Sequence, residues 1–435
     1  MSKLISILIG ILIFCVIVVV HELGHLIVAK KNGILVPEFQ VGFGPKLCSF
    51  KKGETEYSIR LIPFGGACKM LGEDGESDDE RAYTNKKPWA RFATIFAGPF
   101  FNFILAFVLA VIVISIVGYD PCVVTSVTKG SSVEAAGLQR GDIVTSFDGH
   151  HISIGRELYI YFNFNELEGR SYSLTYERDG EKYTTEFTPE LNRSYKLGFY
   201  YSNDNTPCEI GSVIKGGVLE RAGVRAGDVI VGINGTEIAT GAEFNKYITE
   251  NPLDGSEVKF TLQRGNQVQT LMLTPEFTET YVSGFYYNYA GREKTGPLGV
   301  LKYSAVEVKY WIVNTYKSLG QIFKGKVSAD DFGGPVRIVS ELENTVEETK
   351  SDGILYVILN LMNWAILLSA NLGVMNLLPI PALDGGRLVF IIIELIRGKP
   401  VPPEKEGLVH AIGIVLLMAL MVFVFFNDIR NVFFR

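Results

Sequence analysis

Several residue types are scarce in this chain, and each scarcity limits what the protein can be. The 435 residues include five Cys that are scattered and form no Cys-x-x-Cys pair, so neither a disulfide framework nor a Cys-type zinc knuckle is indicated. Only 20% of the residues are charged and the formal net charge is −6, which excludes a strongly basic nucleic-acid binder. At 47% hydrophobic, the chain is too apolar for a disordered protein. With only five His, the positions of the histidines carry information.

Four long apolar runs predict membrane spans at 4–28, 92–117, 354–378 and 408–426. The length of each run is close to that of a helix that crosses a hydrocarbon layer of ~30 Å, which needs about 20 residues. The first run is too long for a signal-peptide core and lacks a small-residue cleavage site, so we expect a retained span. A fifth stretch, 298–323, carries Lys302, Glu307, Lys309 and Lys317, which is typical of an amphipathic surface helix.

Basic residues predict the orientation of the spans. The loop from Lys30 to Arg91 holds eleven Lys and Arg, and the loop between the last two spans holds Arg387, Arg397, Lys399 and Lys405. The positive-inside rule places both loops in the cytoplasm and places both termini and the middle region outside. The acidic run at 73–80 has little effect on this rule, and we expect it to be a solvated loop.

The middle region contains an internal repeat, in which 121–206 aligns with 207–292 at a constant offset of 86. Alternating apolar and polar residues predict half-buried strands in both copies. Each copy carries the run A-G-x-x-x-G-D, and each ends with Gly-Phe-Tyr-Tyr, at Gly198-Phe199 and Gly284-Phe285. These features resemble a circularly permuted PDZ domain, whose Gly-Phe loop binds a peptide carboxylate through backbone amides. A β-domain that has lost peptide binding remains an alternative.

The motif His21-Glu22-Leu23-Gly24-His25 is the strongest chemical signal. On a helix, His21 and His25 lie on one face and can bind one metal ion, and Glu22 borders that face as a general base. The motif lies about 26 Å along the first span at ~1.5 Å per residue, toward the cytoplasmic side. Polar side chains in a span are costly and therefore point to function.

Zinc needs at least one further protein ligand, and Asp384 in Asn376-Leu-Leu-Pro-Ile-Pro-Ala-Leu-Asp384-Gly-Gly is the best placed. Two prolines break the helix before Asp384, at the depth expected for His21. Taken alone, Asp384 is better explained as a helix-terminating Asp-Gly turn, whereas the presence of HELGH favours a metal ligand. His150 and His151 are expected in a solvated turn, and His410 is expected to be an interfacial residue rather than a ligand.

Together these motifs resemble the site-2 protease family, specifically the bacterial RseP-type intramembrane metalloproteases. The resemblance rests on HELGH, Gly42-Phe43-Gly44, Pro63-Phe64-Gly65-Gly66, Ala97-Gly98-Pro99 with Asn102, Gly334-Pro335, Asn371-Leu372-Gly373, NLLPIPALDGG at 376–386 and Phe426-Asn427-Asp428. It implies one zinc ion bound by His21, His25 and Asp384, with Glu22 as general base. It also implies that Asn376 and Asn371 bind the substrate backbone or the oxyanion, and that Gly42, Phe43 and Gly44 belong to a substrate-binding hairpin.

The resemblance further implies a bacterial plasma-membrane enzyme that cleaves single-span proteins such as anti-sigma factors and signal-peptide remnants. These substrates would first be trimmed by a separate site-1 protease. The two alternatives are a PDZ membrane scaffold with structural zinc and, on weaker grounds, a transporter built on inverted repeats. The sequence does not determine whether Cys122 and Cys208 are free thiols.

The expected fold is a multi-pass α-helical membrane protein with four transmembrane helices, two extracytoplasmic PDZ-like α+β domains and a small membrane-associated β-hairpin. Its predicted parts are spans at 1–31, 92–118, 354–383 and 407–430; the cytoplasmic hairpin and acidic loop at 32–91; repeats at 121–206 and 207–292; amphipathic helices outside the membrane at 293–353; and a cytoplasmic loop at 384–406.

Overall fold

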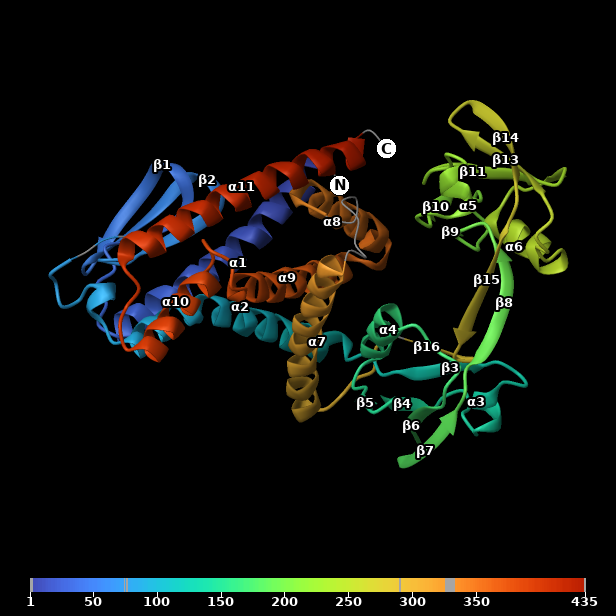
Figure 1. The fold of residues 1–435 in the computed structure, drawn as a ribbon, viewed down its shortest axis with the longest axis horizontal. Helices are drawn as coiled ribbons and strands as arrows, with labels where there is room; N and C mark the ends of the chain where they lie inside the picture. Colours follow the sequence, from blue (N-terminus) through green and yellow to red (C-terminus); the bar gives the residue numbers. More distant parts are fainter. Residues whose placement is uncertain (1–2, 74, 76, 289–290, 325–332, 434–435) are drawn as a thin grey trace. The chain divides into compact units, whose positions relative to one another are not determined.

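The computed structural model describes the whole chain except residues 1–2, 74, 76, 289–290, 325–332 and 434–435 (Figure 1). The chain forms two compact units. The first comprises Met1–Pro121, Ser153–Ile160 and Tyr289–Arg435, and the second comprises Cys122–Ile152 and Tyr161–Asn288. The long helices belong to the first unit, and the repeats form the second.

Four helices of the described chain are long and apolar enough to cross a membrane, which confirms the predicted number of spans. They are α1 (Lys3–Lys31), α2 (Pro88–Val117), α9 (Ile354–Leu377) and α11 (Pro403–Phe433). Helix α2 begins at Pro88, before the predicted start at 92, because proline is favoured in a first helical turn. Helix α9 ends at Leu377, although the predicted span reached 383, because Pro379 and Pro381 cannot continue it.

Small residues bring α2 and α9 close together. Ala106 and Ala110 of α2 and Ala370 of α9 are fully buried in one hydrophobic cluster. The Ser369 hydroxyl of α9 donates a hydrogen bond of 2.8 Å to the carbonyl oxygen of Asn102 on α2. Short side chains and polar bonds of this kind hold helices together in a membrane, where burial of apolar surface adds little.

Two amphipathic helices, α7 (Pro297–Phe323) and α8 (Pro335–Thr349), follow the repeats, and a short 3₁₀ helix η3 (Lys350–Asp352) comes after α8. The Asp428 carboxylate of α11 accepts hydrogen bonds from the backbone N–H of Gly334 (2.9 Å) and of Arg337 (3.0 Å). Asp428 is only 1% exposed. The Gly334-Pro335 and Asn427-Asp428 motifs therefore meet, with α11 supplying the N-terminal cap of α8.

The segment 384–406, predicted to be a cytoplasmic loop, is mostly helical. Helix α10 (Asp384–Arg397) buries Leu388 and Ile391 in a cluster that also contains Leu26 of α1. Its apolar residues recur at helical spacing, and Gly398 ends it in the left-handed conformation with a φ of 68°. The basic residues of this segment predict which side of the membrane it lies on, whereas its helical structure follows from the apolar spacing.

The predicted cytoplasmic hairpin consists of β1 (Glu38–Lys52) and β2 (Thr55–Lys69), and the 3₁₀ helix η1 (Tyr83–Asn85) precedes α2. The two strands are bent, so that Val41 of β1 pairs with both Gly66 and Ile59 of β2. Phe39 and Cys68 are buried in the cluster that contains α1 and α10. The hairpin is therefore a small folded sheet with its buried face against the helices of the first unit.

In the second unit, each repeat forms strands and two short helices in the same order. The first repeat contains β3 (Val123–Val127), α3 (Ser132–Ala135), β4 (Ile143–Phe147), β5 (His150–His151), α4 (Gly155–Phe164), β6 (Tyr172–Arg178) and β7 (Glu181–Phe187). The second contains β10 (Ile210–Val213), α5 (Val218–Arg221), β11 (Val229–Ile233), β12 (Thr236–Glu237), α6 (Gly241–Glu250), β13 (Val258–Arg264) and β14 (Gln267–Leu273). The segment Ser153–Ile160, which includes the first part of α4, belongs to the first unit.

The two repeats exchange their last strands. Strand β9 (Phe199–Tyr201) pairs with β10 of the second repeat, whereas β16 (Phe285–Asn288) pairs with β3 of the first. A ribbon of β8 (Glu190–Lys196) and β15 (Glu276–Val282) joins the copies. The repeats at 121–206 and 207–292 are therefore not self-contained sheets. In this chain, each sheet is completed by a strand from the end of the other copy.

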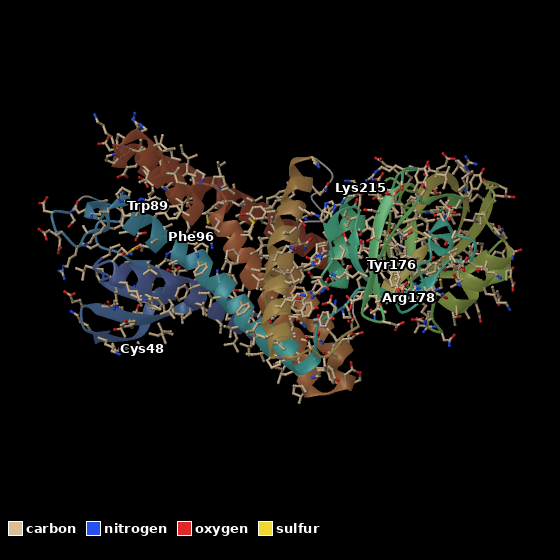
Figure 2. The ribbon with its side chains drawn as sticks, turned by 90° about the horizontal axis from the view of Figure 1, so that it is seen from below. Cys48, Trp89, Phe96, Tyr176, Arg178 and Lys215 are labelled. Carbon is tan, nitrogen blue, oxygen red and sulfur yellow. The ribbon has the colours of Figure 1, made fainter. Side chains whose placement is uncertain are left out.

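In both repeats, the buried aspartate of the Gly-Asp motif makes the same ion pair with an arginine. The Arg178 guanidinium lies 2.7 Å from the Asp142 carboxylate, and that of Arg264 lies 2.6 Å from Asp228. Figure 2 shows Arg178 beside Tyr176, whose ring it covers at 5.2 Å. The hydrogen bond from Arg264 lowers the pKa of Asp228 below its ordinary value. The motif thus ties the loop before each strand to a neighbouring strand.

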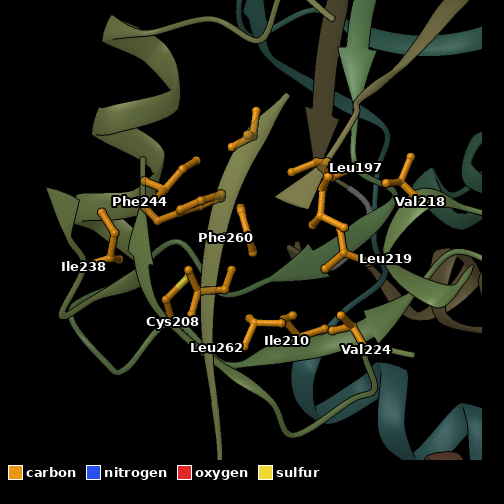
Figure 3. Packing of buried hydrophobic residues seen from close by; sticks show 14 residues of the cluster. Leu197, Cys208, Ile210, Val218, Leu219, Val224, Ile238, Phe244, Phe260 and Leu262 are labelled. Carbon is orange, nitrogen blue, oxygen red and sulfur yellow. The ribbon is translucent and has the colours of Figure 1, made fainter. Parts of the chain in front are cut away.

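The second repeat has a continuous hydrophobic core, in which Phe260 and Leu262 of β13 pack with Ile210 and Leu219 (Figure 3). Cys208 is fully buried in this core, and burial raises the pKa of its thiol to about 11. All five cysteines of the chain, Cys122 and Cys208 included, are free thiols.

Candidate active site

The structure brings His21, His25 and Asp384 together. The Nε2 atoms of the two imidazoles are 3.2 Å apart, and the Asp384 Oδ2 atom lies 3.2 Å from that of His21 and 3.5 Å from that of His25. All three ligand atoms fall within 4.8 Å of one another. Two imidazole nitrogens and one carboxylate oxygen at this spacing can bind a single divalent metal such as zinc.

Close packing of α1 on α2 fixes the two histidines. Both are at least nine-tenths buried, at 8% and 6% exposed. A Cβ atom on Gly98 of α2 would lie 2.2 Å from His25 Nε2, and one on Gly24 of α1 would lie 2.4 Å from the Ala97 carbonyl oxygen. Both positions therefore require glycine, and the motif Ala97-Gly98-Pro99 supplies the surface on which the imidazoles lie.

Helix α2 also holds the outer nitrogens of both imidazoles. His25 Nδ1 lies 2.9 Å from the Thr94 carbonyl oxygen, so Nδ1–H donates there and Nε2 keeps its lone pair for a metal. His21 Nδ1 lies 3.2 Å from the Asn102 side-chain nitrogen, while the buried Asn102 Oδ1 has no partner among the described residues. Turning this amide by 180° satisfies both groups, since Asn102 Oδ1 then accepts from His21 Nδ1–H.

Thr94 and Asn102 have functions that the sequence did not reveal. A backbone carbonyl such as that of Thr94 leaves no mark in a sequence. Asn102 did leave one, as an amide within an apolar span, four residues after Gly98. When a membrane helix comes after a metal-binding motif in the sequence, an Asn within that helix is a candidate for a hydrogen bond to one of the metal-ligating side chains.

Asp384 enters the site from the first residue of α10, after the turn that follows α9. Its Oδ2 atom is buried and forms no hydrogen bond within the described part of the chain. An orphaned carboxylate oxygen that faces two imidazole Nε2 atoms fits a bound cation and is otherwise costly. The residues therefore fit the zinc ion that the motif implies.

Ion pairs from distant segments hold α10 in place. Glu394 of α10 pairs with Arg91 at the start of α2 at 2.5 Å, and both side chains are largely buried. Arg387, one turn after Asp384, pairs with Glu73. Glu73 begins the acidic run at 73–80, so the expectation of a solvated loop is wrong for this residue: its side chain is 16% exposed and holds α10.

Glu22 is half-buried and lies beside strand β2. A Cβ atom on Gly66 would lie 3.1 Å from Glu22 Cγ, and the Cys15 thiol donates a hydrogen bond of 2.7 Å to the Pro63 carbonyl oxygen. The stretch 63–66 therefore lies along α1 from Cys15 to Glu22. No hydrogen bond or ion pair occupies the Glu22 carboxylate among the described residues, which leaves it available to exchange protons.

Gly42, Phe43 and Gly44 lie where β1 bends, next to the same part of β2. Both glycines have positive φ values, 82° and 85°, and the Phe43 ring lies so close to Gly65 that a Cβ there would be 2.2 Å from it. Phe43 is 48% exposed. The predicted hairpin residues therefore stand near Glu22 through Gly65 and Gly66.

The two predicted asparagines of α9 have different surroundings. Asn376 lies in the last turn of the helix and is half-buried. Asn371 Oδ1 accepts a hydrogen bond of 2.6 Å from the Thr315 hydroxyl of α7. Asn371 thus joins α7 to α9 and has its amide oxygen already occupied.

The predicted peptide loops of the repeats lie at the start of β9 and β16. Gly198 and Gly284 have φ values of 81° and 76°, and Phe285 is buried. Strand β16 is the last strand of its sheet, so one of its edges has no strand partner among the described residues. His150 and His151 are exposed on β5, away from any group of possible metal ligands in the described chain. His410 lies near the start of α11.

Comparisons with known proteins show the family of the chain. A model of Peptidase family M50 matches residues 9–420. The zinc metalloprotease RasP of Geobacillus kaustophilus is 34% identical over 443 residues, covering 98% of each chain. The regulator of sigma-W protease RasP of Bacillus subtilis is 33% identical over 436 residues, covering 97% of this chain and 98% of that one. The solved HtrA3 PDZ domain with a phage-derived ligand covers 21% of this chain at 17% identity and a TM-score of 0.18.

A candidate membrane span that carries two histidines, with the carboxylate at the start of α10 beside them, is the arrangement of a membrane-embedded metalloprotease. With nearly its whole length matched, the chain belongs to Peptidase family M50, the site-2 proteases. It is a bacterial membrane protein and an enzyme, so the expectation of a site-2 protease is confirmed and the scaffold alternative is not supported.

Proposed function

We propose that this chain hydrolyses a peptide bond within a transmembrane segment, with one zinc ion held by His21, His25 and Asp384. The convergence of their ligand atoms within 4.8 Å carries this proposal. When bound, zinc polarises the scissile carbonyl and acidifies a water molecule. With only three protein ligands, a bound zinc would keep a position for water or substrate, as catalytic zinc sites do, whereas structural sites are closed by four protein ligands.

Glu22 is the proposed general base. It takes a proton from the attacking water as the new C–O bond forms, and it later gives that proton to the leaving amine as the C–N bond breaks. Its place three residues before His25, on the same helix, puts it at the border of the metal-binding face. The stretch 63–66 of β2 lies along this side of α1, from Cys15 to Glu22.

The hairpin is the proposed docking site for the unwound substrate. A helix in the membrane must lose backbone hydrogen bonds before it can be cleaved, and pairing with a strand edge replaces them. Gly42, Phe43 and Gly44 lie near Glu22 through Gly65 and Gly66, which favours this part of the sheet.

Asn376 is the proposed ligand for the substrate backbone or the oxyanion. It precedes Asp384 by eight residues and lies at the end of α9 that leads into the metal site. The amide of Asn371 is engaged by Thr315, which makes Asn371 the weaker candidate.

Single-span membrane proteins that have lost their outer domain are the proposed substrates. The Bacillus subtilis relative is a regulator of sigma-W protease, which supports an anti-sigma factor as one substrate class, with signal-peptide remnants as a second. We place the repeats and both termini outside the cell and the metal site toward the cytoplasm, from the basic loops. A separate site-1 protease would make the first cut.

The repeats are proposed to exclude untrimmed substrates by size, with the Gly198-Phe199 and Gly284-Phe285 loops as possible peptide sites. One substrate should be tested with and without its outer domain. Wild type should cleave only the trimmed form, and deletion of 121–292 should also permit cleavage of the intact form. If the deletion variant cleaves trimmed but never intact substrate, the repeats do not exclude by size.

The proposed activity is tested by co-expression with candidate single-span proteins. Wild type should give a product shortened within the span, and Glu22→Gln should give none while retaining one zinc per chain. A product that persists with Glu22→Gln, or a wild-type protein without stoichiometric zinc, would refute the proposal.

A further inference from the structure

The turn that delivers Asp384 contains a strained residue. Ala382 has a φ of 76°, in the left-handed region that alanine rarely adopts. The other non-glycine residues with positive φ in the described chain are Asp148, Asp179 and Asn234. Each of those can bond locally through its side chain and precedes a glycine in a tight turn, which is typical of such turns. Ala382 has neither feature, so a tertiary contact must hold it.

Helix α11 supplies that contact. The backbone N–H of Ala382 donates a hydrogen bond of 2.9 Å to His410 Nδ1. Nearly one turn further along α11, a Cβ atom on Gly413 would lie 2.5 Å from the Pro381 carbonyl oxygen, so the helix lies directly against the turn. The His410 ring also contacts Phe390 of α10, with centroids 5.6 Å apart. His410 is therefore not only an interfacial residue, as its position in the sequence had indicated.

We propose that His410 is a positioning residue for the metal site. It holds Ala382 in its left-handed conformation and so directs the chain that places the Asp384 carboxylate, two residues later, against His21 and His25. To accept at Nδ1, the ring must be neutral with its proton on Nε2. The inference rests on the proposed metal site, but the hold on Ala382 is a property of the protein without metal.

Two variants separate the hydrogen bond from the ring. His410→Phe keeps an aromatic ring beside Phe390 and removes the acceptor, whereas the Oδ1 atom of His410→Asn can take the place of Nδ1. In the purified full-length protein, zinc affinity is measured by competition with a chelator. His410→Phe should bind zinc ~10-fold or more weakly, as for loss of a group that orients a ligand, and His410→Asn should restore most of that affinity.

Ala382→Gly tests the route of the effect. Glycine adopts a φ of 76° without the alanine penalty, so it should recover part of the affinity lost in His410→Phe. The Co²⁺-substituted proteins add a spectroscopic readout, because loss of the Asp384 ligand changes the visible absorption of the metal. A structural role of His410 elsewhere in α11 would not be corrected by a change at Ala382.

Hydrogen exchange of the segment 378–386 in metal-free protein gives an independent test. His410→Phe should exchange faster there than wild type and His410→Asn, with thermal unfolding as a check on the overall fold. Equal zinc affinity and exchange in His410→Phe and wild type, or equal losses in both His410 variants, would overturn the inference. Wild-type protein that binds no zinc would instead refute the proposed function, while the exchange comparison would still decide whether His410 holds the turn.

Discussion

The two halves of the metal site are built in different ways. Helix α1 supplies His21 and His25 at positions four residues apart, so their spacing follows from helix geometry alone. Helix α10 supplies Asp384, whose place depends on a strained turn and on ion pairs with distant segments. We call His21 and His25 the local half of the site and Asp384 the tertiary half, because its position depends on tertiary structure. Different substitutions should therefore weaken metal binding through each half.

Crowding the local half should have the largest effect. In Gly98→Ala, the new Cβ would lie 2.2 Å from His25 Nε2, so the imidazole or α2 must move. We expect zinc affinity to fall by ~10–100-fold, from about 1–3 kcal/mol of overpacking, and proteolysis to disappear. Metal content after dialysis and a chelator titration measure this.

Gly320→Ala is the matched control for this substitution. Gly320 lies in α7, where a Cβ would meet no atom within 4 Å. Replacing glycine by alanine in a helix should leave zinc binding unchanged and stabilise the protein by up to ~1 kcal/mol. If Gly98→Ala retains wild-type zinc affinity, then packing on α2 does not fix the local half.

Removing the support of His21 should have the next largest effect. Asn102→Leu keeps the branched shape of the side chain but removes the acceptor for His21 Nδ1–H, so zinc affinity should fall by ~10–100-fold. Ser369→Ala is the control, because its hydroxyl bonds to the Asn102 backbone and not to the amide. Equal losses in both variants would mean that helix packing, and not the imidazole contact, is responsible.

Loosening α10 should weaken the tertiary half to a smaller degree. Glu394→Gln breaks the pair with Arg91, and we expect a ~3-fold loss of zinc affinity, because residues acting through a helix change coupling by about 0.5–2 kcal/mol. The exchanged pair Arg91→Glu with Glu394→Arg should recover it. Loss of the exposed pair Arg193–Glu279 should have no effect on zinc. If Glu394→Gln lost as much zinc affinity as Gly98→Ala, the two halves of the site would not differ in how strongly they depend on their supports.

The sequence predicted features of the fold that depend on neighbouring residues. Apolar runs and a constant offset of 86 are local or periodic, so four spans and a duplication were visible. The strand exchange was not visible, because two similar copies give the same sequence pattern whether the last strand of each pairs within its own copy or with the other copy. Helix α10 was not predicted although its apolar spacing is present, since the segment was described only as the connection between the last two spans.

The same division applies to the site. His21 and His25 form a motif, and Asp384 stands out after two prolines in an apolar setting. The contacts that hold them were not visible: Thr94 acts through its backbone, and Glu73 lies in a run whose average character is solvated. His410 matters through the φ angle of Ala382, which no periodicity encodes. Sequence patterns thus identified reacting groups better than the groups that position them.

The smallest effect, a change in stability, is expected at the β1–β2 hairpin, which lies beside the local half of the site. Ion pairs stabilise this hairpin, whereas helix geometry fixes the two histidines. Hydrogen bonds from Lys69, and then from Arg60 and Ser58, lower the pKa of Glu38 from 4.5 to about 2. Because the folded pKa is the lower one, the stabilisation is complete above about 4.5 and is lost as the pH falls toward about 2. Glu38→Gln should therefore lower stability by about 1 kcal/mol at pH 7, a modest amount because Lys69 is half exposed and screened by solvent. Thermal unfolding of metal-free protein should show the wild-type advantage shrinking between pH 4.5 and the acid limit, and a difference that stays constant with pH would mean that Glu38 stabilises the sheet by packing rather than by charge.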